Sequence, residues 1–500
     1  MVELIDPQAR RLRNSRRRAL VLVLVQVLLL AHIAHWLLTG SSLAPLEPSE
    51  ASRFAREKVI NPGLIVLGVA IASTLLFGRF FCGWACHFLA VQDGCAWLLR
   101  RLKIRVRPLR SRALRIVPIM AFVWMFLVPL YARLYARISS GGVQHASSEW
   151  MTESFWKTFP GPAVSIITFL IAGCYVVYLL GNKAFCNYAC PYGAILGASD
   201  SFSVGRIVVD PDLCNSCMAC TKACSSDVIV HQEIKEFGAV VDNKCMKTLD
   251  CVASCPNQAL SFQLAAPAVL RSSNNPNAQQ RHPLSLSEEL VLALGFCFGF
   301  FATHDLFGAV PFLLALGFGL VAAHSALALK KKHLSFKKSK VKYTAHLLAL
   351  VFFAHSGLVQ SQALMRDHYF DQTFDMRMAY LRGELELPLK PESLQNFLRA
   401  DSYASRTTVL SYAGFERDDY VHAWRHLAAG NNKLFEDYML SVLDYRPGFG
   451  EVIFQLGIHY GVQGDNQRAI EWMQQITADD ARYANAQEYI ENISSHLEQH

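Results

Sequence analysis

The stretch Cys214-Asn-Ser-Cys217-Met-Ala-Cys220-Thr-Lys-Ala-Cys224 carries four cysteines at the spacing C-x-x-C-x-x-C-x-x-x-C, and Cys245, Cys251 and Cys255-Pro256 follow it. At this spacing a short loop wraps three thiolates around one iron–sulfur cluster, and the fourth thiolate reaches a second cluster. A structural zinc site would instead use four ligands in two pairs. The stretch therefore predicts a small domain built around two iron–sulfur clusters.

The spacing also predicts which cysteines share a cluster. The first cluster is expected to be bound by Cys214, Cys217, Cys220 and Cys255. The second is expected to be bound by Cys224, Cys245 and Cys251. Residues 206–210 and 238–242 precede the two runs and are expected to form short strands, as in a ferredoxin-like α+β domain over residues 200–265.

The second run departs from the pattern at Thr248, which stands where its second cysteine is expected. Cluster two therefore has three obvious thiolates. It could be a [3Fe-4S] cluster, or a [4Fe-4S] cluster with an oxygen ligand such as Thr248 or Asp250. It could also borrow a distant cysteine or be absent, and the sequence leaves these alternatives open. Fewer thiolates change the charge of the site and its reduction potential.

Apolar segments lie on both sides of this domain, in a chain that is 52% hydrophobic with 31 Phe. A bilayer span needs about 20 apolar residues. Seven candidate spans lie near residues 19–38, 62–81, 113–132, 162–181, 287–304, 309–329 and 343–360. The first is expected to be a retained anchor, because its apolar run is too long for a cleavable signal.

The net charge of +8 is concentrated beside these spans. Residues 10–18, 100–115 and 330–342 hold 21 of the 48 Lys and Arg residues. Basic residues beside spans stay in the cytoplasm, which predicts a cytoplasmic amino terminus and a cytoplasmic segment 182–286. Loops 39–61 and 133–159 and the segment 361–500 are then periplasmic. The expected location is the bacterial inner membrane, in contact with lipid, and a nucleic-acid partner is disfavoured.

Two further cysteine pairs follow the second and fourth spans. They are Gly78-Arg-Phe-Phe-Cys82-Gly-Trp-Ala-Cys86-His87 and Asn182-Lys-Ala-Phe-Cys186-Asn-Tyr-Ala-Cys190-Pro191, which align at an offset of 104 residues as basic residue, Phe, Cys, aromatic, Ala, Cys. Duplicated spans can bring their motifs together on one site. The four cysteines could bind a metal or a further iron–sulfur cluster, could act as a redox dithiol, or could be buried apolar residues. His87 could be a ligand or a proton carrier near a quinone.

These motifs carry a family resemblance. A twice-repeated F-C-x-x-x-C motif after membrane spans, followed by a double-cluster segment, resembles the NapH/NosR/CcoG group of membrane polyferredoxins over about residues 60–265. The resemblance implies membrane-bound electron transfer that serves a respiratory reductase, or the maturation of a respiratory oxidase. The chain departs from the family at His87, where proline is usual, and at Thr248.

The remaining cysteines and the histidines point to no clear site. All 14 cysteines precede residue 298, as expected for thiolate ligands on the reducing side rather than for disulfides. Cys95, Cys174 and Cys297 are expected to be core residues. Histidines in or at the ends of spans could bind haem b, which we disfavour because their spacing is not diagnostic; they are His32, His35, His304, His324, His346 and His355.

The last 140 residues form a separate region after the polar linker 266–286. Leu456-Gly457, Tyr460, Gly464 and Ala469 fit a tetratricopeptide (TPR) pattern, and a helix over Lys433–Tyr445 precedes them. Such repeats stack into surfaces that dock partner proteins. A plain helical bundle is the alternative.

The predicted fold is mainly α. A membrane domain (residues 1–199, with spans 5–7 in 287–360) carries the insert 200–265, and a TPR-like domain covers 361–500. The expected function is electron relay from a cytoplasmic or quinone donor to a respiratory acceptor. An assembly factor that reduces or delivers metal to a respiratory complex, and a redox sensor, are the alternatives. No nucleotide loop, catalytic triad or flavin motif is visible, so we expect an electron-transfer subunit rather than a self-contained enzyme.

Overall fold

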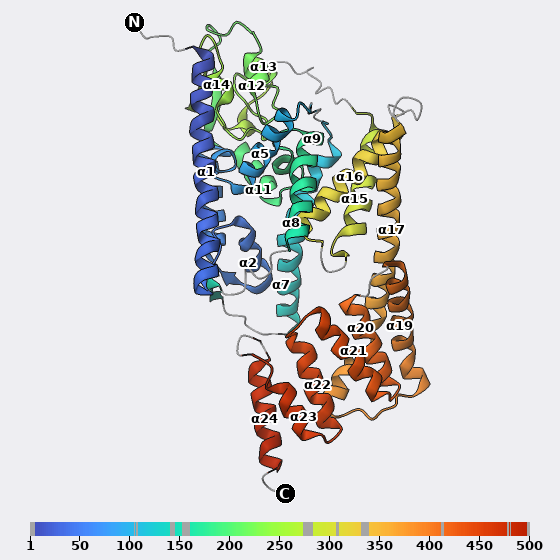
Figure 1. The fold of residues 1–500 in the computed structure, drawn as a ribbon. Helices are drawn as coiled ribbons and strands as arrows, with labels where there is room; N and C mark the ends of the chain where they lie inside the picture. Colours follow the sequence, from blue (N-terminus) through green and yellow to red (C-terminus); the bar gives the residue numbers. More distant parts are fainter. Residues whose placement is uncertain are drawn as a thin grey trace. The chain divides into compact units, whose positions relative to one another are not determined.

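The computed structural model describes residues 6–104, 106, 109–140, 146–152, 161–273, 284–306, 310–331, 340–411, 415–477, 480 and 482–497. The chain divides into two compact units, residues 1–350 and 351–500. Helices predominate in both units, and every strand belongs to a two-stranded pairing (Figure 1).

Most of the long apolar helices lie in the first unit, and α17 runs from it into the second. Among the described residues, six helical stretches are long and apolar enough to cross a bilayer, namely α1 (Pro7–Thr39), Ala113–Tyr135, Pro162–Leu180, α15 (Leu286–Thr303), α16 (Phe312–Lys330) and α17 (Lys340–Asp371). They coincide with six of the seven predicted spans. The predicted span at 62–81 is the shorter helix α3 (Pro62–Phe77), so the count of seven remains a prediction.

Two of these stretches contain π-helical turns. The first consists of η2 (Ala113–Ile116), α6 (Val117–Phe122), η3 (Val123–Leu127) and α7 (Val128–Ser140), and the second of α8 (Pro162–Thr168), η5 (Phe169–Tyr175) and α9 (Val176–Leu180). The π-helical turns are η3 and η5. Helix α16 packs on η5, where a Cβ on Gly317 would lie 2.9 Å from the side chain of Ile171. Small residues let membrane helices approach in this way.

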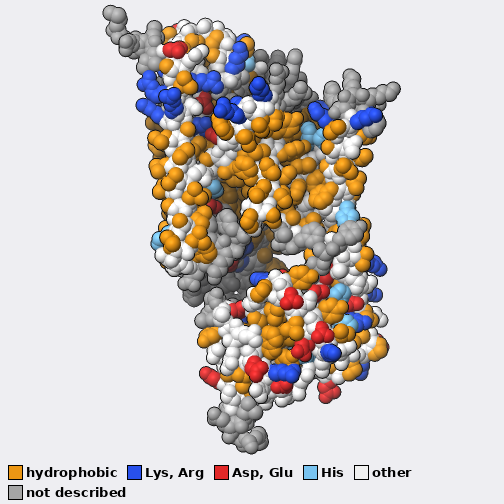
Figure 2. All heavy atoms as spheres, viewed as in Figure 1, with side chains coloured by type: hydrophobic (Ala, Val, Ile, Leu, Met, Phe, Trp, Pro, Cys, Tyr) orange, Lys and Arg blue, Asp and Glu red, His pale blue; other side chains and the backbone are white. Residues whose placement is uncertain are grey.

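The ends of the membrane helices differ in character. Strand β1 (Ser42–Leu43) pairs with β4 (Met151–Thr152), and β2 (Val59–Ile60) pairs with β3 (Ser147–Ser148), so the loops 39–61 and 133–159 lie at the same end. Arg110 in the second basic stretch forms an ion pair with Asp227 of the insert. Figure 2 shows apolar side chains along the helices of this unit and a blue band of Lys and Arg near the amino-terminal end of α1.

The insert is built on the antiparallel pair β5 (Gly205–Val209) and β6 (Leu260–Leu264). Between them lie α12 (Ala219–Ala223), α13 (Val230–Phe237) and α14 (Asp250–Ala253). The predicted strand at 206–210 is confirmed as β5, but the one at 238–242 is wrong, because that segment forms a single bridge, Val208 to Ala239. The backbone N–H groups of Val241 and Asp242 donate to the Glu233 carboxylate and are not available to extend a ladder.

The second unit is helical throughout its described residues. Its helices are the end of α17, α18 (Phe374–Leu381), α19 (Pro391–Ser411), α20 (Glu416–Ala428), α21 (Asn432–Tyr445), α22 (Gly450–Val462), α23 (Asn466–Met473) and α24 (Tyr483–Leu497). The hairpins α20–α21 and α22–α23 begin 34 residues apart, and each turns at a glycine of positive φ, Gly430 and Gly464. The unit has its own core around Trp424 and Phe435.

A buried histidine should make this second unit sensitive to acid. His459 is 1% exposed, its Nδ1 lies 2.7 Å from the Tyr380 hydroxyl, and burial lowers its pKa from 6.5 to about 4. The folded state therefore favours the neutral ring: its contribution is complete above pH 6.5 and is lost as the pH falls toward 4. We expect a loss on the order of 2 kcal/mol at pH 5.

Hydrogen exchange of α22 in the full chain, corrected for intrinsic rates at pH 7.5 and pH 5, measures this loss. His459→Gln should flatten the pH dependence, whereas the same change at the exposed His368 should leave it as in the parent chain. Equal acid sensitivity in His459→Gln and the parent chain would contradict the assignment.

Candidate functional site

The insert gathers its cysteines around one interior. Cys220, Cys245, Cys251 and Cys255 are core residues of a single buried cluster, and Cys214 and Cys224 pack against it. Of the seven cysteines of the insert, Cys217 alone is exposed. Residues 41 positions apart in sequence therefore meet, as the two-cluster spacing predicts.

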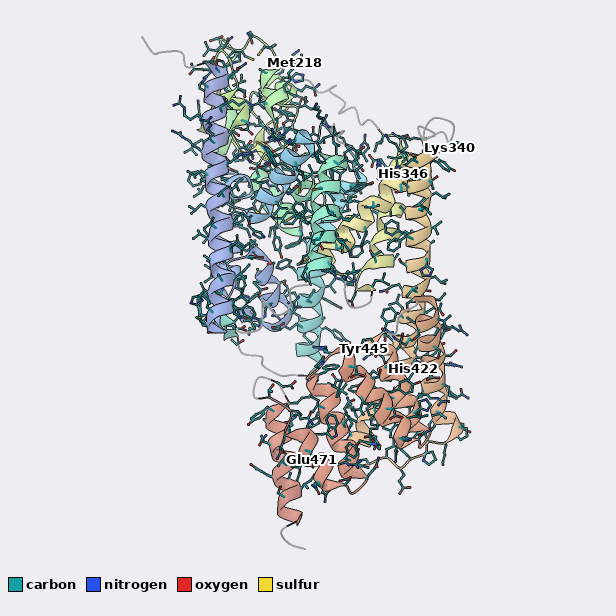
Figure 3. The ribbon with its side chains drawn as sticks, viewed as in Figure 1. Met218, Lys340, His346, His422, Tyr445 and Glu471 are labelled. Carbon is teal, nitrogen blue, oxygen red and sulfur yellow. The ribbon has the colours of Figure 1, made fainter. Side chains whose placement is uncertain are left out.

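The backbone of the two cysteine runs is duplicated. Residues in the left-handed region occur in three pairs 31 positions apart, which are Ser216 and Lys247, Met218 and Leu249, and Asp227 and Gln258. Non-glycine residues rarely adopt positive φ, so three matched pairs indicate two copies of one loop conformation. Figure 3 labels Met218 in the first copy. Thr248 therefore occupies, in the second loop, the position that Cys217 occupies in the first.

The surroundings of Thr248 are polar. Its hydroxyl lies 3.5 Å from that of Ser225, which donates to Asp250, and Asn14 of α1 donates to both the Thr248 carbonyl and the Asp250 carboxylate. Both Asp250 oxygens thus accept hydrogen bonds. The amino-terminal end of α1 also contacts the insert through Arg10, whose Nη2 donates to the Cys255 carbonyl at 2.7 Å.

The thiols assigned to cluster two lie close together. Burial, followed by the neighbouring Cys245, raises the pKa of Cys224 to about 12. Burial and the nearby Cys245 and Cys224 raise the pKa of Cys251 well above its usual value. Thiols that raise one another's pKa in this way are stable as thiolates when they bind a metal centre, because metal binding removes the protons.

The four membrane cysteines also converge. Cys82 lies in the one-turn helix α4 (Phe80–Trp84), and Cys86 is the N-cap residue of α5 (His87–Arg101). In the second copy the corresponding helices are α10 (Ala184–Tyr188) and α11 (Pro191–Ser201), with Cys186 and Cys190 in the same places. Cys82 and Cys186 share one buried cluster, and Cys86 packs against it.

Close backbone packing and hydrogen bonds fix these thiols. Gln92 Nε2 lies 2.9 Å from the Cys186 sulfur, while Gln92 Oε1 accepts from the Phe185 N–H. The Gly193 N–H points at the Cys190 sulfur at 3.4 Å. A Cβ on Gly193 would overlap the Cys186 carbonyl oxygen, so only glycine allows this approach.

Burial disfavours ionisation of three of these thiols, Cys86, Cys186 and Cys190. Burial, followed by neighbouring thiols, raises the pKa of Cys186 to about 11 and that of Cys190 to about 12, and raises that of Cys86 well above its usual value. Four thiolates in one buried place repel one another, so ionisation requires compensating positive charge.

Two basic residues at equivalent positions of the duplicated motifs supply part of that charge. Arg79 is 2% exposed and Lys183 is 2% exposed, and each directly precedes the helix that carries the first cysteine of its pair. Lys183 pairs with Asp93 at 3.4 Å. The guanidinium of Arg79 lies beside Cys82 and Cys186; its Nη1 donates to the Asn243 carbonyl, and its Nε and Nη2 have no nitrogen or oxygen partner among the described residues.

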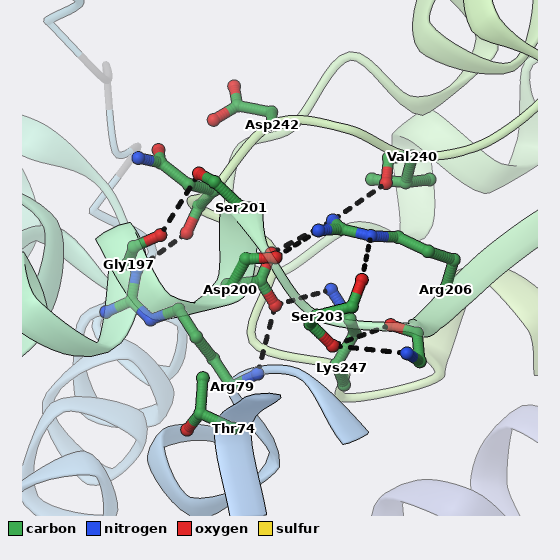
Figure 4. Close-up of polar contacts among 12 residues, drawn as sticks. Thr74, Arg79, Gly197, Asp200, Ser201, Ser203, Arg206, Val240, Asp242 and Lys247 are labelled. Atoms are coloured by element: carbon green, nitrogen blue, oxygen red, sulfur yellow. Dashed lines mark hydrogen bonds and ion pairs between the residues drawn. The ribbon is translucent and has the colours of Figure 1, made fainter. Parts of the chain in front are cut away.

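A buried ion network adjoins Arg79 (Figure 4). Asp200 accepts from the Arg79 backbone N–H at 3.1 Å, from Lys247 Nζ at 2.9 Å and from Arg206 Nη1 at 3.0 Å. Asp200, Arg206 and Lys247 are all at most 1% exposed. One carboxylate thus faces two buried side-chain cations, with a third in Arg79 nearby, and a buried excess of positive charge is costly unless an anion offsets it.

The residues present fit an iron–sulfur cluster better than a single metal ion. Among the described residues, no three His, Cys, Asp or Glu side chains are placed to hold one ion. A cubane cluster differs because each of its four irons takes its own thiolate. All 14 cysteines are free. A cluster held by four thiolates remains an anion, which matches the excess positive charge and the unpartnered Arg79 nitrogens.

His87 and the other histidines are placed less favourably for ligation. The His87 ring lies 3.8 Å from Glu47, a contact to a carboxylate rather than to a thiol. His324 and His346 stack edge-on at 5.2 Å between ring centroids, which leaves no space for a haem between them. His304 is the C-cap residue of α15.

Of the three remaining cysteines, Cys95 is a core residue as expected and Cys174 packs against the same buried cluster, whereas the expectation is wrong for Cys297. Cys297 is exposed on α15 and is not a core residue, because it faces away from the α16 packing surface that Gly295 and Gly299 provide. Cys95 and Cys174 are not isolated, since their sulfur atoms lie 3.2 Å apart.

Sequence reasoning missed several residues around the cysteines. Arg79 and Lys183 were visible as the shared basic position of the two motifs, but nothing marked them as buried. Nothing in the sequence indicated the roles of Gln92, Asn14 and Met246. Gln92 contacts Cys186, 94 residues away, and Asn14 contacts Thr248 and Asp250, 234 and 236 residues away. Met246 joins the buried cluster of Cys82 and Cys186 from a loop far from both in the sequence.

Comparison with known proteins agrees with this geometry. A family model described as a 4Fe-4S binding domain matches residues 62–105 and again 162–208, and a 4Fe-4S dicluster domain matches residues 206–256. The first model thus covers each copy of the membrane cysteine motif with its preceding helix. No solved structure matches the chain.

Several known proteins are similar to part of this chain. The ferredoxin-type protein NapH of Haemophilus influenzae is 27% identical over 241 residues, which are 45% of this chain and 73% of NapH. The putative electron transport protein YccM of Escherichia coli is 27% identical and covered to 57%, with 41% of this chain aligned. The regulatory protein NosR of Stutzerimonas stutzeri is 26% identical and covered to 31%, with 46% of this chain aligned.

The family models thus match the membrane cysteine motifs and the insert, and each relative aligns with less than half of this chain. The matched ranges contain thirteen of the fourteen cysteines, all but Cys297. The chain therefore carries 4Fe-4S binding domains and is similar over part of its length to ferredoxin-type proteins.

Proposed function

We propose that this protein relays electrons at the membrane, between a cytoplasmic or quinone donor and a respiratory acceptor, through the insert and a further iron–sulfur centre at Cys82, Cys86, Cys186 and Cys190. The observation that carries the proposal is the convergence of these four cysteines from two duplicated segments, beside the buried guanidinium of Arg79. Iron–sulfur clusters supply one-electron chemistry, and the reduction potential depends on charge, hydrogen bonds and exposure.

Each set of residues has a role in this proposal. Cys214, Cys217, Cys220 and Cys255 hold cluster one, at the exposed side of the insert where Cys217 lies. Cys224, Cys245 and Cys251 hold cluster two, with Thr248 in the fourth position. The buried cations Arg79 and Lys183 stabilise the thiolates of the membrane site and contribute to the reduction potential of its centre.

The second unit is proposed to dock a partner. Its two hairpins recur at 34 residues, which is the TPR period, and each begins its second helix after an Asn or Asp that caps it, Asn431 and Asp465. Stacked hairpins of this kind present surfaces to other proteins. A redox partner of the membrane domain is the partner that we propose.

We also propose the orientation that the basic stretches indicate, with the insert in the cytoplasm and the second unit in the periplasm. Alkaline phosphatase, which folds only outside the cytoplasm, should be active when fused after His500 and silent when fused within the linker 266–286. Activity of the linker fusion together with silence of the carboxyl-terminal fusion would reverse the orientation.

The membrane cysteines provide the main test of function. Replacing Cys186 with Ser should remove about four iron atoms per chain and the matching sulfide, since a centre without its fourth thiolate in a buried site is unstable. Cys82→Ser should have the same effect, because the two residues are repeat equivalents. Iron and acid-labile sulfide analysis with electron paramagnetic resonance of the purified protein measures both.

Cys297→Ser is the matched control, since this exposed cysteine lies outside both cysteine groups. It should keep the full iron content. If Cys186→Ser keeps the iron, sulfide and spectra of the parent chain, the membrane cysteines are packing residues and the proposal is wrong.

The duplicated loop yields a separate prediction for Thr248. Because the second loop has the backbone of the first, Thr248→Cys should place a thiolate at the ligand position that Cys217 holds in the first. An added thiolate brings negative charge, so the midpoint potential of cluster two should fall and its paramagnetic signal should become that of an all-thiolate [4Fe-4S] cluster. Leu249→Cys, one residue away, should leave both unchanged. An identical spectrum and potential in Thr248→Cys would show that residue 248 does not face the cluster.

A further inference from the structure

The segment that supplies Cys245 also forms part of the membrane cysteine site. Met246 is fully buried and belongs to the same cluster as Cys82 and Cys186. A Cβ on Gly83, the residue after Cys82, would overlap the Met246 carbonyl oxygen. Met246 therefore directly follows the insert cysteine Cys245 in the chain and belongs to the buried cluster that contains Cys82 and Cys186.

The duplicated motifs hold this segment at their equivalent aromatic positions. Trp84, between Cys82 and Cys86, donates its indole N–H to the Lys247 carbonyl at 3.0 Å. Its counterpart Tyr188, between Cys186 and Cys190, lies with its hydroxyl 3.2 Å from Lys244 Nζ and with its ring under the same ammonium. The two copies thus bind residues 244–247 from two sides.

The basic position contributes a third attachment. Arg79 Nη1 donates to the Asn243 carbonyl at 2.7 Å. The Lys247 ammonium is fixed on Asp200, which also accepts from the Arg79 backbone. No comparable attachment to the membrane cysteines is found for the first loop among the described residues, and Met218 there is 46% exposed.

We propose that the segment 243–247 is the joint between the two cysteine groups, and that Met246 is the side chain that couples them electronically. This inference rests on the proposed function and adds the path that electrons take: they pass between the insert and the membrane site through the second loop, not through the first. One electron passes, so one centre is oxidised by one electron while the other is reduced by one, and no bond or proton changes. Packed atoms couple redox groups better than a void does.

The test compares three variants in the full purified chain. Met246→Ala should keep the iron and sulfide content but open a gap in the joint, Met246→Leu should refill it because the two side chains are close in volume, and Met218→Ala serves as the control in the first loop. Two readouts apply. Pulsed paramagnetic resonance measures how one reduced centre speeds the spin relaxation of the other, and optical spectra after a one-electron flash reduction with photoexcited deazaflavin measure equilibration between the centres.

Met246→Ala should slow equilibration by about tenfold or more and should weaken the relaxation effect, because the packed contacts across the gap are lost. Met246→Leu and Met218→Ala should match the parent chain. The inference is overturned if both centres are present in Met246→Ala and equilibrate as fast as in the parent chain, or if Met246→Leu behaves like Met246→Ala.

Two further outcomes are distinguishable. If the parent chain itself lacks the membrane centre, the proposed function fails along with the inference, whereas an intact centre with unaltered coupling overturns the inference alone. If Met246→Ala loses iron, Trp84→Phe replaces it in the comparison: it removes the hydrogen bond to Lys247 while keeping an aromatic ring, and it should give the same slowing with iron retained.

Discussion

Ionising four buried thiols beside one another is the constraint on which the membrane part of this protein depends. Burial and neighbouring thiols raise the pKa of Cys86, Cys186 and Cys190. The site can hold thiolates only if positive charge is buried with them. Arg79 and Lys183, which the duplication places at the same point of each motif, supply part of this charge, and the iron–sulfur centre that we propose would take the thiolates as ligands.

The buried cations create a second requirement, because a guanidinium or ammonium without an anion is itself costly. Asp93 offsets Lys183, while Asp200 faces Arg206 and Lys247 together. The Arg206 Nη2 also donates to the Asp200 carbonyl, so the network is tied to the backbone of α11. Arg206 belongs to β5 and Lys247 to the second loop, and both pair with Asp200 of α11. This ion network therefore attaches the insert to the helix that follows Cys190.

The parts of this arrangement that local sequence specifies were predictable. Cluster-binding spacing predicted the meeting of the two runs, and hydrophobic length predicted six of the long helices. The strand expected at 238–242 was wrong because Glu233, on the preceding helix, takes the N–H groups that a ladder needs. The roles of Asn14, Gln92 and Met246 could not be predicted, because each follows from contacts between distant segments, and an isolated polar or apolar residue gives no indication of its partner.

The second loop keeps the backbone conformation of the first although Thr248 stands at the position of a cysteine. If cluster binding alone maintained the backbone of residues 245–251, replacing a ligand by Thr248 would remove the reason for its strained left-handed residues. Lys247 and Leu249 nevertheless keep the φ values of their counterparts Ser216 and Met218. The attachments of Lys247 to Trp84 and Asp200 supply an independent reason, since they require that loop shape whether or not residue 248 is a ligand. The first loop has no such attachment in the described chain, and it retains all of its cysteines.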